Sequence, residues 1–305
     1  MKKIIKSTKQ IMQIVKKEHV DLIHTHSQSL CVIGSIIKFF TGIPYIWTNH
    51  IDEMANPKLF KIVLKVLHFP IISVSTDLKN MLINDFGLKE SRIRVINNGI
   101  YAKDFYPLEE NEKNELKQKF NCKDKYVISL LARMSYGKGH MYLLEAINKM
   151  QTEREISNVK LLIAGKCHKD EEKYLKRLQE YSNNHDIDME FLGFQKPRDV
   201  FGISNISVLP SIYEGFGLTV IESCAMECPV IRSRTPGWID TDEIALSFEK
   251  EDVDGLYEKL VYAYYNNDDM INLAKKGKQV VMDKFTIEHQ VNETVDFYNN
   301  ILSHN

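Results

Sequence analysis

The sequence predicts an α/β protein built from two parallel sheets, each covered by helices. Short apolar runs rich in β-branched residues alternate with helix-length stretches along the whole chain, which is the pattern of βαβ units. A chain of 305 residues is long enough for two domains. Charge is also divided, because residues 1–105 hold 15 Lys and Arg against 8 Asp and Glu, whereas the remainder holds 25 against 33. A basic first third and an acidic remainder indicate two units with different partners.

The first third alternates strands and helices, and the polar stretch 101–122 after it marks the boundary between the units. Strands are expected at 21–26, 45–49, 71–75 and 93–97, with helices at 30–40, 57–67 and 77–86 and a lysine-rich helix at the start of the chain. The second part continues the pattern. Strands are expected at 126–132, 159–165, 189–192, 206–210 and 230–233, with helices at 109–120, 140–150, 171–184, 217–227, 254–266, 270–283 and 287–302.

The composition excludes several protein classes. With 44% hydrophobic and 27% charged residues, the chain is neither disordered nor collagenous. Five cysteines without a C-x-x-C pair favour a reducing compartment. Lysines interrupt the N-terminal apolar residues, so no secretory signal is expected. The longest apolar run, 30–47, contains Lys38, Gly42 and Pro44, which favours a buried helix and strand over a membrane span.

A glycine-rich turn after strand 126–132 is the first candidate site. Arg133, Gly137, Lys138 and Gly139 stand there, immediately before a helix. Glycines permit a tight turn, a helix N-terminus offers N–H donors, and an arginine with a lysine suits a diphosphate. The alternative is a solvated loop with two surface bases.

Two glutamates eight residues apart form the second candidate. Glu214 precedes the helix 217–227 and Glu222 lies inside it, so both can face one cleft. N–H groups of Gly217, Leu218 and Thr219 would bind an anion, while the carboxylates would accept hydrogen bonds from sugar hydroxyls. We expect the helix dipole to keep these carboxylates ionised. The alternative makes Glu222 a surface residue and Glu214 a helix cap.

These segments resemble glycosyltransferase family 4, the group 1 glycosyltransferases of the GT-B fold. The similarity includes the E-x7-E motif within PSIYEGFGLTVIESCAMECPVI, the LARMSYGKG loop, and the DLIHTHS, IPYIWTNH and VINNGI segments. It implies two Rossmann-like domains facing across a cleft. We expect an N-terminal acceptor-side domain at 1–105, a nucleotide-sugar domain at 106–285, and a C-terminal helix at 286–305 that packs back on the first domain.

The resemblance assigns roles residue by residue. Arg133 and Lys138 would hold the diphosphate and offset leaving-group charge. Glu214 would bind hydroxyls of the donor sugar and Glu222 those of the ribose. The backbones of Gly217, Leu218 and Thr219 would contact phosphate, and Phe194 and Gln195 would lie near the base.

Histidines at strand ends are further candidates. His50 follows strand 45–49, where the family has a histidine near the sugar and acceptor, so we expect a catalytic contact there. His24 and His26 lie on one face of their strand, and one of them could also reach the cleft. For an isolated histidine, packing or surface exposure is the commoner role.

The sequence departs from the family at its start and in one loop. The family normally opens with a strand and a Gly-Gly turn before the segment that resembles residues 1–20, so an incomplete N-terminal domain is expected. A truncated start, a companion subunit that completes the domain, and an inactive remnant are the competing explanations. The segment Thr235 to Asp240 also replaces the usual paired glycines and glutamate.

No cofactor or metal is expected. Asp252 and Asp254 resemble a metal-binding D-x-D pair, but they directly precede a helix and fit capping better. The lysine-rich first helix could rest on an anionic membrane, although packing on the first domain is the safer prediction. We therefore expect a cytoplasmic protein, with peripheral contact at the inner face of the cell membrane left open.

Together these features predict a metal-independent, retaining glycosyltransferase of the hexosyltransferase type. It would move a sugar from a nucleotide-diphosphate donor, UDP-sugar first among them, to a saccharide or lipid-linked acceptor in bacterial cell-surface polysaccharide or glycoconjugate synthesis, without a nucleic acid partner. The alternative is a catalytically inactive GT-B subunit or remnant that binds nucleotide or stabilises a partner glycosyltransferase.

Overall fold

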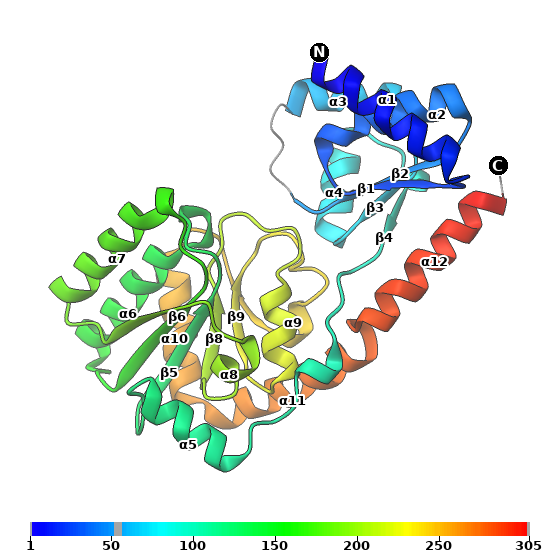
Figure 1. The fold of residues 1–305 in the computed structure, drawn as a ribbon. Helices are drawn as coiled ribbons and strands as arrows, with labels where there is room; N and C mark the ends of the chain where they lie inside the picture. The colour runs from blue at the N-terminus through cyan, green and yellow to red at the C-terminus, as the bar shows by residue number, and fades with distance from the viewer. Residues whose placement is uncertain (1, 52–56, 304–305) are drawn as a thin grey trace. The chain divides into compact units, whose positions relative to one another are not determined.

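The computed structural model describes residues 2–51 and 57–303 (Figure 1). Contacts divide the chain into two compact units. The first unit comprises Met1–Asn98 and Glu288–Asn305, and the second comprises Gly99–Ile287. This division falls after residues 98 and 287, whereas the sequence-based domain limits lie at 105 and 285. Neither unit has a described helix that is long and apolar enough to cross a membrane.

The described sheet of the first unit has four parallel strands in the order β1-β2-β3-β4. The strands are β1 (Ile23–Thr25), β2 (Tyr45–Asn49), β3 (Ile71–Ser73) and β4 (Ile93–Val95). Each is paired in register with the next, as in Ile23 with Tyr45 and Trp47 with Ile71. Three of the four are shorter than predicted. At β3 and β4 an apolar residue, Val74 and Ile96 respectively, continues past the paired segment.

Helices cover both faces of this sheet (Figure 1). On one face lie α1 (Lys2–Lys17), α2 (Cys31–Thr41), α3 (Pro57–Val66) and α4 (Thr76–Asn84). Their apolar residues pack with Tyr45, Trp47 and Ile71 in two adjoining clusters. On the other face, Phe297 and Tyr298 of α12 (Ile287–Ser303) pack against Ile46 of β2, Ile72 of β3 and Ile96, which directly follows β4. Because successive side chains of a strand point to opposite faces of the sheet, each face has its own apolar layer.

The second unit contains a six-stranded parallel sheet in the order β10-β9-β8-β5-β6-β7. Its strands are β5 (Tyr126–Leu131), β6 (Val159–Ala164), β7 (Met189–Gly193), β8 (Ile206–Leu209), β9 (Val230–Ser233) and β10 (Leu246–Phe248). Its helices are α5 (Glu110–Lys119), α6 (His140–Arg154), α7 (Glu172–Asn184), α8 (Pro197–Phe201), α9 (Leu218–Ala225), α10 (Val253–Tyr265) and α11 (Asn267–Lys284).

Alternate residues of the central strand β5 show how this sheet is covered. Ile128 and Leu130 face the cluster formed by α6, α7 and α10. Val127 and Leu131 face smaller clusters that include residues of α5 and α8. Both faces are buried, in keeping with a strand whose residues are apolar except for Ser129.

Two elements of the second unit are absent from the sequence prediction. Strand β10 has three residues and pairs only at the sheet edge with β9, and helix α8 has five residues that begin at Pro197. Elements this short carry too few residues to establish a period of 2.0 or 3.6.

A buried arginine at the end of β9 joins two loops of the second unit. Arg232 has no exposed surface and donates through Nη1 to the carbonyl oxygens of Phe216 (3.3 Å) and Gly237 (2.8 Å). Its Nη2 donates to the carbonyl oxygens of Thr235 and Pro236, both at 3.1 Å. The guanidinium therefore ties the turn before α9 to the loop 235–241, the segment that departs from the family pattern.

Replacement of this arginine should destabilise the second unit. Arg232→Met keeps much of the apolar stem but leaves buried carbonyl oxygens without donors, so the free energy of unfolding should fall by at least about 3 kcal/mol in urea titrations. The matched control is Arg234→Met, two residues away, because Arg234 is half exposed and its main ion pair is with Glu249 at 2.5 Å. That control should cost less than about 1 kcal/mol. Equal losses in the two variants would contradict the proposed role of Arg232.

Candidate functional site

Several of the predicted donor-binding residues line one cavity of the second unit. The cavity has a volume of about 290 Å³, and its walls include Arg133, Phe194, Gln195, Thr219 and Glu222. These residues follow β5, β7 and β8, where the carboxyl ends of parallel strands meet at one edge of the sheet. Glu222 and Leu218 also line a neighbouring cavity of about 520 Å³. The motifs are therefore brought together, although they stand up to 89 residues apart between Arg133 and Glu222.

Backbone contact joins the glycine-rich turn to the segment that carries Glu214. The carbonyl oxygen of Gly137 accepts a hydrogen bond from the N–H of Ile212 at 2.8 Å. Gly139 has φ +71°, and a Cβ there would lie 1.8 Å from the carbonyl oxygen of Pro210. Both the left-handed backbone and the close approach require glycine at this position.

Lys138 and Glu214 form an ion pair across this contact. Lys138 Nζ lies 2.5 Å from Glu214 Oε1, and the Ser211 hydroxyl donates to the same oxygen at 2.8 Å. Both ionic side chains are largely shielded from solvent. Glu214 is thus a positioned hydrogen-bond acceptor beside a cation, and a carboxylate has further lone pairs for a ligand hydroxyl.

Arg133 lies at the rim of the cavity. Its side chain is 62% exposed, and its Nε lies 3.6 Å from Glu171 Oε1. An exposed ion pair at this distance is weak, so the guanidinium remains available to an anionic ligand.

The N-terminus of α9 supplies backbone donors beside the same cavity. Gly217 caps the helix with φ +88°, and Leu218 and Thr219 form its first turn. N–H groups in the first turn of a helix have no carbonyl partner one turn earlier, and the helix dipole adds positive charge there.

Glu222 behaves differently from the sequence expectation that the helix dipole keeps it ionised. Burial raises the pKa of this carboxyl to about 7. Glu222 lies in the second turn of α9, and the effect of the dipole falls off within the first turn, so desolvation dominates. Burial therefore favours the protonated form of this carboxyl more than at an exposed glutamate.

Phe194 and Gln195 follow β7, and both line the cavity. The ring of Phe194 is mostly exposed, with Lys166 Nζ 5.6 Å from its centroid. Gln195 donates to the carbonyl oxygen of Leu192 at 2.8 Å, which orients its amide. An exposed ring at a cavity wall is suited to stacking on a planar ligand.

Three residues of this neighbourhood were not predicted: Lys166, Glu171 and Ser211. Lys166 lines the cavity, Glu171 pairs with Arg133, and Ser211 bonds Glu214. Lys166 and Ser211 each come two residues after the end of a strand, β6 and β8 respectively, so the rule that ligands meet strand carboxyl ends applies to them too.

The predicted histidine lies in the first unit. His50 directly follows β2, and its Nε2 is 2.8 Å from His26 Nδ1. Both line a cavity of about 490 Å³ in that unit. Burial, followed by the neighbouring charge of His26, lowers the pKa of His50. A neutral imidazole can donate a hydrogen bond to a ligand hydroxyl and can also accept one from it.

His24 has a structural role. Its Nδ1 lies 2.5 Å from the Tyr298 hydroxyl and its Nε2 lies 2.6 Å from Thr48 Oγ1, so both ring nitrogens are engaged. Burial lowers its pKa to about 4. His24 therefore links the sheet to α12, and His26 is the histidine of that strand that reaches the cavity.

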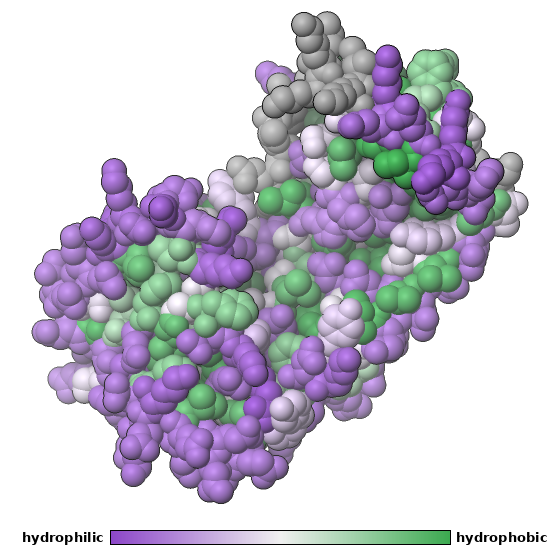
Figure 2. Space-filling view, viewed as in Figure 1, coloured by the Kyte–Doolittle hydropathy of each residue, from purple (hydrophilic) through white to green (hydrophobic). Residues whose placement is uncertain are grey.

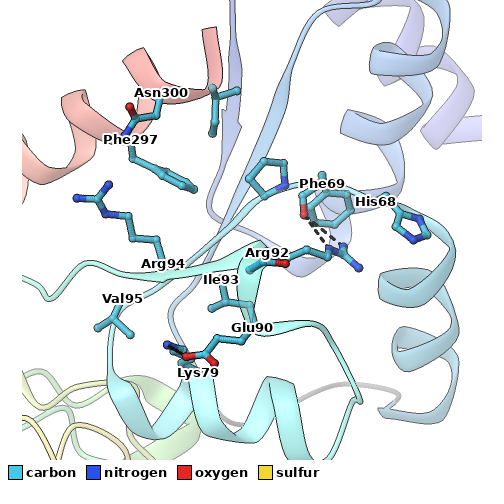
Figure 3. Close-up of a pocket in the computed structure, with 13 residues that line it drawn as sticks. His68, Phe69, Lys79, Glu90, Arg92, Ile93, Arg94, Val95, Phe297 and Asn300 are labelled. Atoms are coloured by element: carbon cyan, nitrogen blue, oxygen red, sulfur yellow. Dashed lines mark hydrogen bonds and ion pairs between the residues drawn. The ribbon is translucent and has the colours of Figure 1, made fainter. Parts of the chain in front are cut away.

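A larger cavity of about 670 Å³ lies at the amino ends of β3 and β4 in the first unit (Figure 3). Its charged side chains are engaged within the fold. Arg92 donates to backbone carbonyls that follow α3, Lys79 pairs with Glu90 at 2.7 Å, and Arg94 lies over the ring of Phe297. None of the predicted site residues lines this cavity.

Residues 2–51 and 57–303 contain no group of three His, Cys, Asp or Glu side chains placed to hold a metal ion. Asp252 instead caps α10, where its Oδ1 accepts from the N–H of Gly255 at 2.9 Å.

Family comparisons agree with this arrangement. Residues 111–280 match the family model for glycosyl transferases group 1, and residues 2–103 match the model for Glycosyltransferase Family 4. The first match alone covers more than half of the chain. The chain belongs to the group 1 glycosyltransferases.

Curated relatives in this family span most of the chain. A Staphylococcus aureus capsular polysaccharide biosynthesis glycosyltransferase, CapM, is 27% identical over 98% of this chain and 81% of its own length. The UDP-Gal:alpha-D-GlcNAc-diphosphoundecaprenol alpha-1,3-galactosyltransferase of Escherichia coli is 25% identical over 97% of this chain and 79% of its own length. Membership and these relatives assign the chain a glycosyltransferase role.

Solved structures share the fold. A glycosyltransferase from Rickettsia africae superposes with a TM-score of 0.87 at 24% identity, over 99% of this chain and 82% of that chain. Anabaena HepE in complex with UDP-glucose superposes with a TM-score of 0.83 at 17% identity, over 96% of this chain and 82% of that chain. The two parallel-sheet units are thus those of a GT-B glycosyltransferase.

The raised pKa of Glu222 predicts a pH-dependent cost of folding. The carboxyl has an ordinary pKa of 4.5 when unfolded and about 7 when folded, so wild-type protein loses stability as pH rises through this interval. Glu222→Gln removes the cost. Its advantage in free energy of unfolding over wild type should grow between about pH 4.5 and about pH 8 by up to about 3 kcal/mol in urea titrations.

The control for this measurement is Glu227→Gln. Glu227 is exposed and pairs with Lys278 at 2.7 Å, so Glu227→Gln relieves no buried charge and should not stabilise the protein at about pH 8. A pH-independent difference for Glu222→Gln would contradict the buried-carboxyl assignment.

Proposed function

We propose that this glycosyltransferase moves a hexosyl group from a nucleoside-diphosphate sugar, a UDP-sugar first among them, to a saccharide or lipid-linked acceptor. Transfer proceeds with retention of anomeric configuration and without a metal ion. The observation that carries the proposal is the backbone contact between the turn 133–139 and the segment 210–214. This contact places Lys138 against Glu214, beside the N-terminus of α9.

The diphosphate binds between fixed cations and helix donors. Lys138 is a point charge held by its ion pair, and the exposed fork of Arg133 closes on phosphate oxygens. The N–H groups of Leu218 and Thr219 complete the anion site. The same groups offset the charge that develops on the leaving phosphate, which is the task of a divalent cation in metal-dependent transferases.

The carboxyl groups select the sugar parts of the donor. Glu214 accepts from hydroxyls of the transferred sugar, next to the phosphate cations. Glu222, whose pKa burial has raised to about 7, accepts from the ribose hydroxyls and loses its proton on binding. Phe194 stacks on the base, and Gln195 lies beside the base.

The first unit supplies the acceptor side. His50, paired with His26, contributes a catalytic contact to the sugar or acceptor hydroxyl from its own cavity. Relatives named for capsular polysaccharide synthesis and for a diphosphoundecaprenol-linked acceptor support a saccharide or lipid-linked acceptor in cell-surface glycan synthesis.

Nucleotide binding tests the diphosphate site. In calorimetric titrations with UDP, Lys138→Ala and Arg133→Ala should each weaken binding by roughly tenfold or more, because each removes a charge-assisted hydrogen bond. Lys173→Ala, an exposed lysine of α7, is the matched control and should bind as wild type does. Unchanged affinity in both site variants would refute the assignment.

Turnover tests the transfer reaction itself. With a panel of UDP-hexoses and lipid-linked acceptors, UDP release should continue in excess EDTA, and NMR of the product should show the anomeric configuration of the donor. Glu214→Ala should abolish release without unfolding the protein, which circular dichroism would check. Inversion, loss of turnover with EDTA, or full turnover by Glu214→Ala would each overturn the corresponding part. Nucleotide binding without any turnover would indicate the inactive-subunit alternative.

A further inference from the structure

Three neighbouring helices of the first unit share an unusual charge distribution. By sequence, α1, α2 and α3 contain ten lysines and no aspartate or glutamate. All three pack on the face of the sheet opposite α12 (Figure 1). By sequence this layer is strongly basic, whereas the whole chain has a net charge of −1. Among its described lysines, Lys9, Lys16, Lys17, Lys58 and Lys65 are exposed.

Large apolar side chains stand among these lysines without contributing to the core. At the end of α2, Phe39 is 83% exposed and Phe40 is 67% exposed. On α3, Ile62 is 60% and Val66 is 67% exposed. Figure 2 shows hydrophobic residues at the surface over α2, beside hydrophilic residues over α1. Side chains of this size normally bury most of their surface, so their exposure needs a reason.

Helix packing explains why these residues point outward. Ile33 and Ile37 of α2 pack against α1, and Phe60 and Leu64 of α3 pack against the sheet. Residues two positions after an inward-facing residue turn by about 200° around a helix, so Ile62 and Val66 face away from the core.

The two exposed groups lie on neighbouring helices. Lys38 Nζ, next to Phe39 and Phe40, donates to the carbonyl oxygen of His68 at 3.4 Å, just beyond the end of α3. The ends of α2 and α3 are thus adjacent. We define the basic apolar face as Phe39, Phe40, Ile62 and Val66 with the interleaved lysines Lys38, Lys58 and Lys65.

We propose that this basic apolar face docks on the surface of an anionic lipid bilayer. Phe39 and Phe40 enter the interfacial region, Ile62 and Val66 lie along it, and the lysines contact lipid phosphates while their stems cover apolar surface. Lysine is depleted at the centre of protein interfaces, so a face in which lysines alternate with phenylalanines fits lipid better than a protein partner.

This surface differs from the one that the sequence suggested. The lysine-rich α1 packs through Ile11, Met12 and Val15 against α2, so it supports the layer, and the exposed aromatic residues belong to α2. Docking does not require the transfer reaction or a bound nucleotide. Its test is therefore independent of the proposed donor site.

Vesicle sedimentation of the full chain tests the proposal. Wild-type protein should bind vesicles of equal phosphatidylglycerol and phosphatidylcholine at least tenfold more tightly than pure phosphatidylcholine vesicles. Binding should weaken when salt rises from about 0.1 M to about 1 M, because the screening length falls from about 10 Å to about 3 Å. Phe39→Ser/Phe40→Ser and Lys58→Glu/Lys65→Glu should each reduce binding to anionic vesicles at least tenfold.

Matched controls separate docking from general effects. Val291→Ser/Val295→Ser changes two exposed apolar residues of α12, and Lys173→Glu/Lys176→Glu changes two exposed lysines of α7. Both should bind vesicles as wild type does. Thermal midpoints within a few degrees of wild type would show that all variants fold.

Three results would overturn the proposal. The first is that wild-type protein does not bind anionic vesicles. The second is that the control variants lose as much vesicle binding as the variants of the basic apolar face. The third is that Phe39→Ser/Phe40→Ser binds anionic vesicles as wild type does. Sedimentation velocity supplies a fourth. A wild-type dimer that becomes monomeric in Phe39→Ser/Phe40→Ser would show that a second copy of the chain covers this face instead.

Discussion

The close backbone contact between the turn 133–139 and the segment 210–214 is the constraint on which the candidate site depends. Gly139 must be a glycine because the carbonyl of Pro210 occupies the space of its Cβ, and Gly137 accepts the N–H of Ile212. This contact brings Lys138 and Glu214 within ion-pair distance. Arg232 also holds the carbonyl oxygen of Phe216, directly before Gly217, which caps α9. A cation, an acceptor and a helix N-terminus are thereby fixed before any ligand arrives, so little ordering cost is left for binding.

Burial determines what each ionisable group of the site can do. Glu214 meets a cation, whereas Glu222, eight residues later, lies in a desolvated position that raises its pKa to about 7. The histidines of the first unit also differ in their surroundings. His24 is enclosed by Tyr298 and Thr48 and links α12 to the sheet, while His26 and His50 pair at a cavity. Identical side chains thus acquire different roles from their surroundings.

Much of the fold and part of the site could be predicted from the sequence. Long buried strands such as β5 and β6 have apolar runs that are hard to mistake, and the residues after them mark the carboxyl edge of the sheet. Arg133, Phe194, Gln195, Thr219 and Glu222 could therefore be expected to meet, as they do at one cavity. Short elements such as β10 and α8 were not predicted, because they are too short to show a period. Edge pairing defines β10, and a proline at the first helical position marks α8.

The sequence by itself determined the βαβ order, the glycine-rich turn, the E-x7-E spacing and the basic character of the first third, since all of these depend on residue type and local period. Only the tertiary structure decided which groups are desolvated or paired. The raised pKa of Glu222, the engagement of His24 and the exposure of Phe39 and Phe40 between lysines follow from neighbours that are distant in the sequence. Local patterns specify which surface a helix buries, but solvation and charge depend on everything that packs around it.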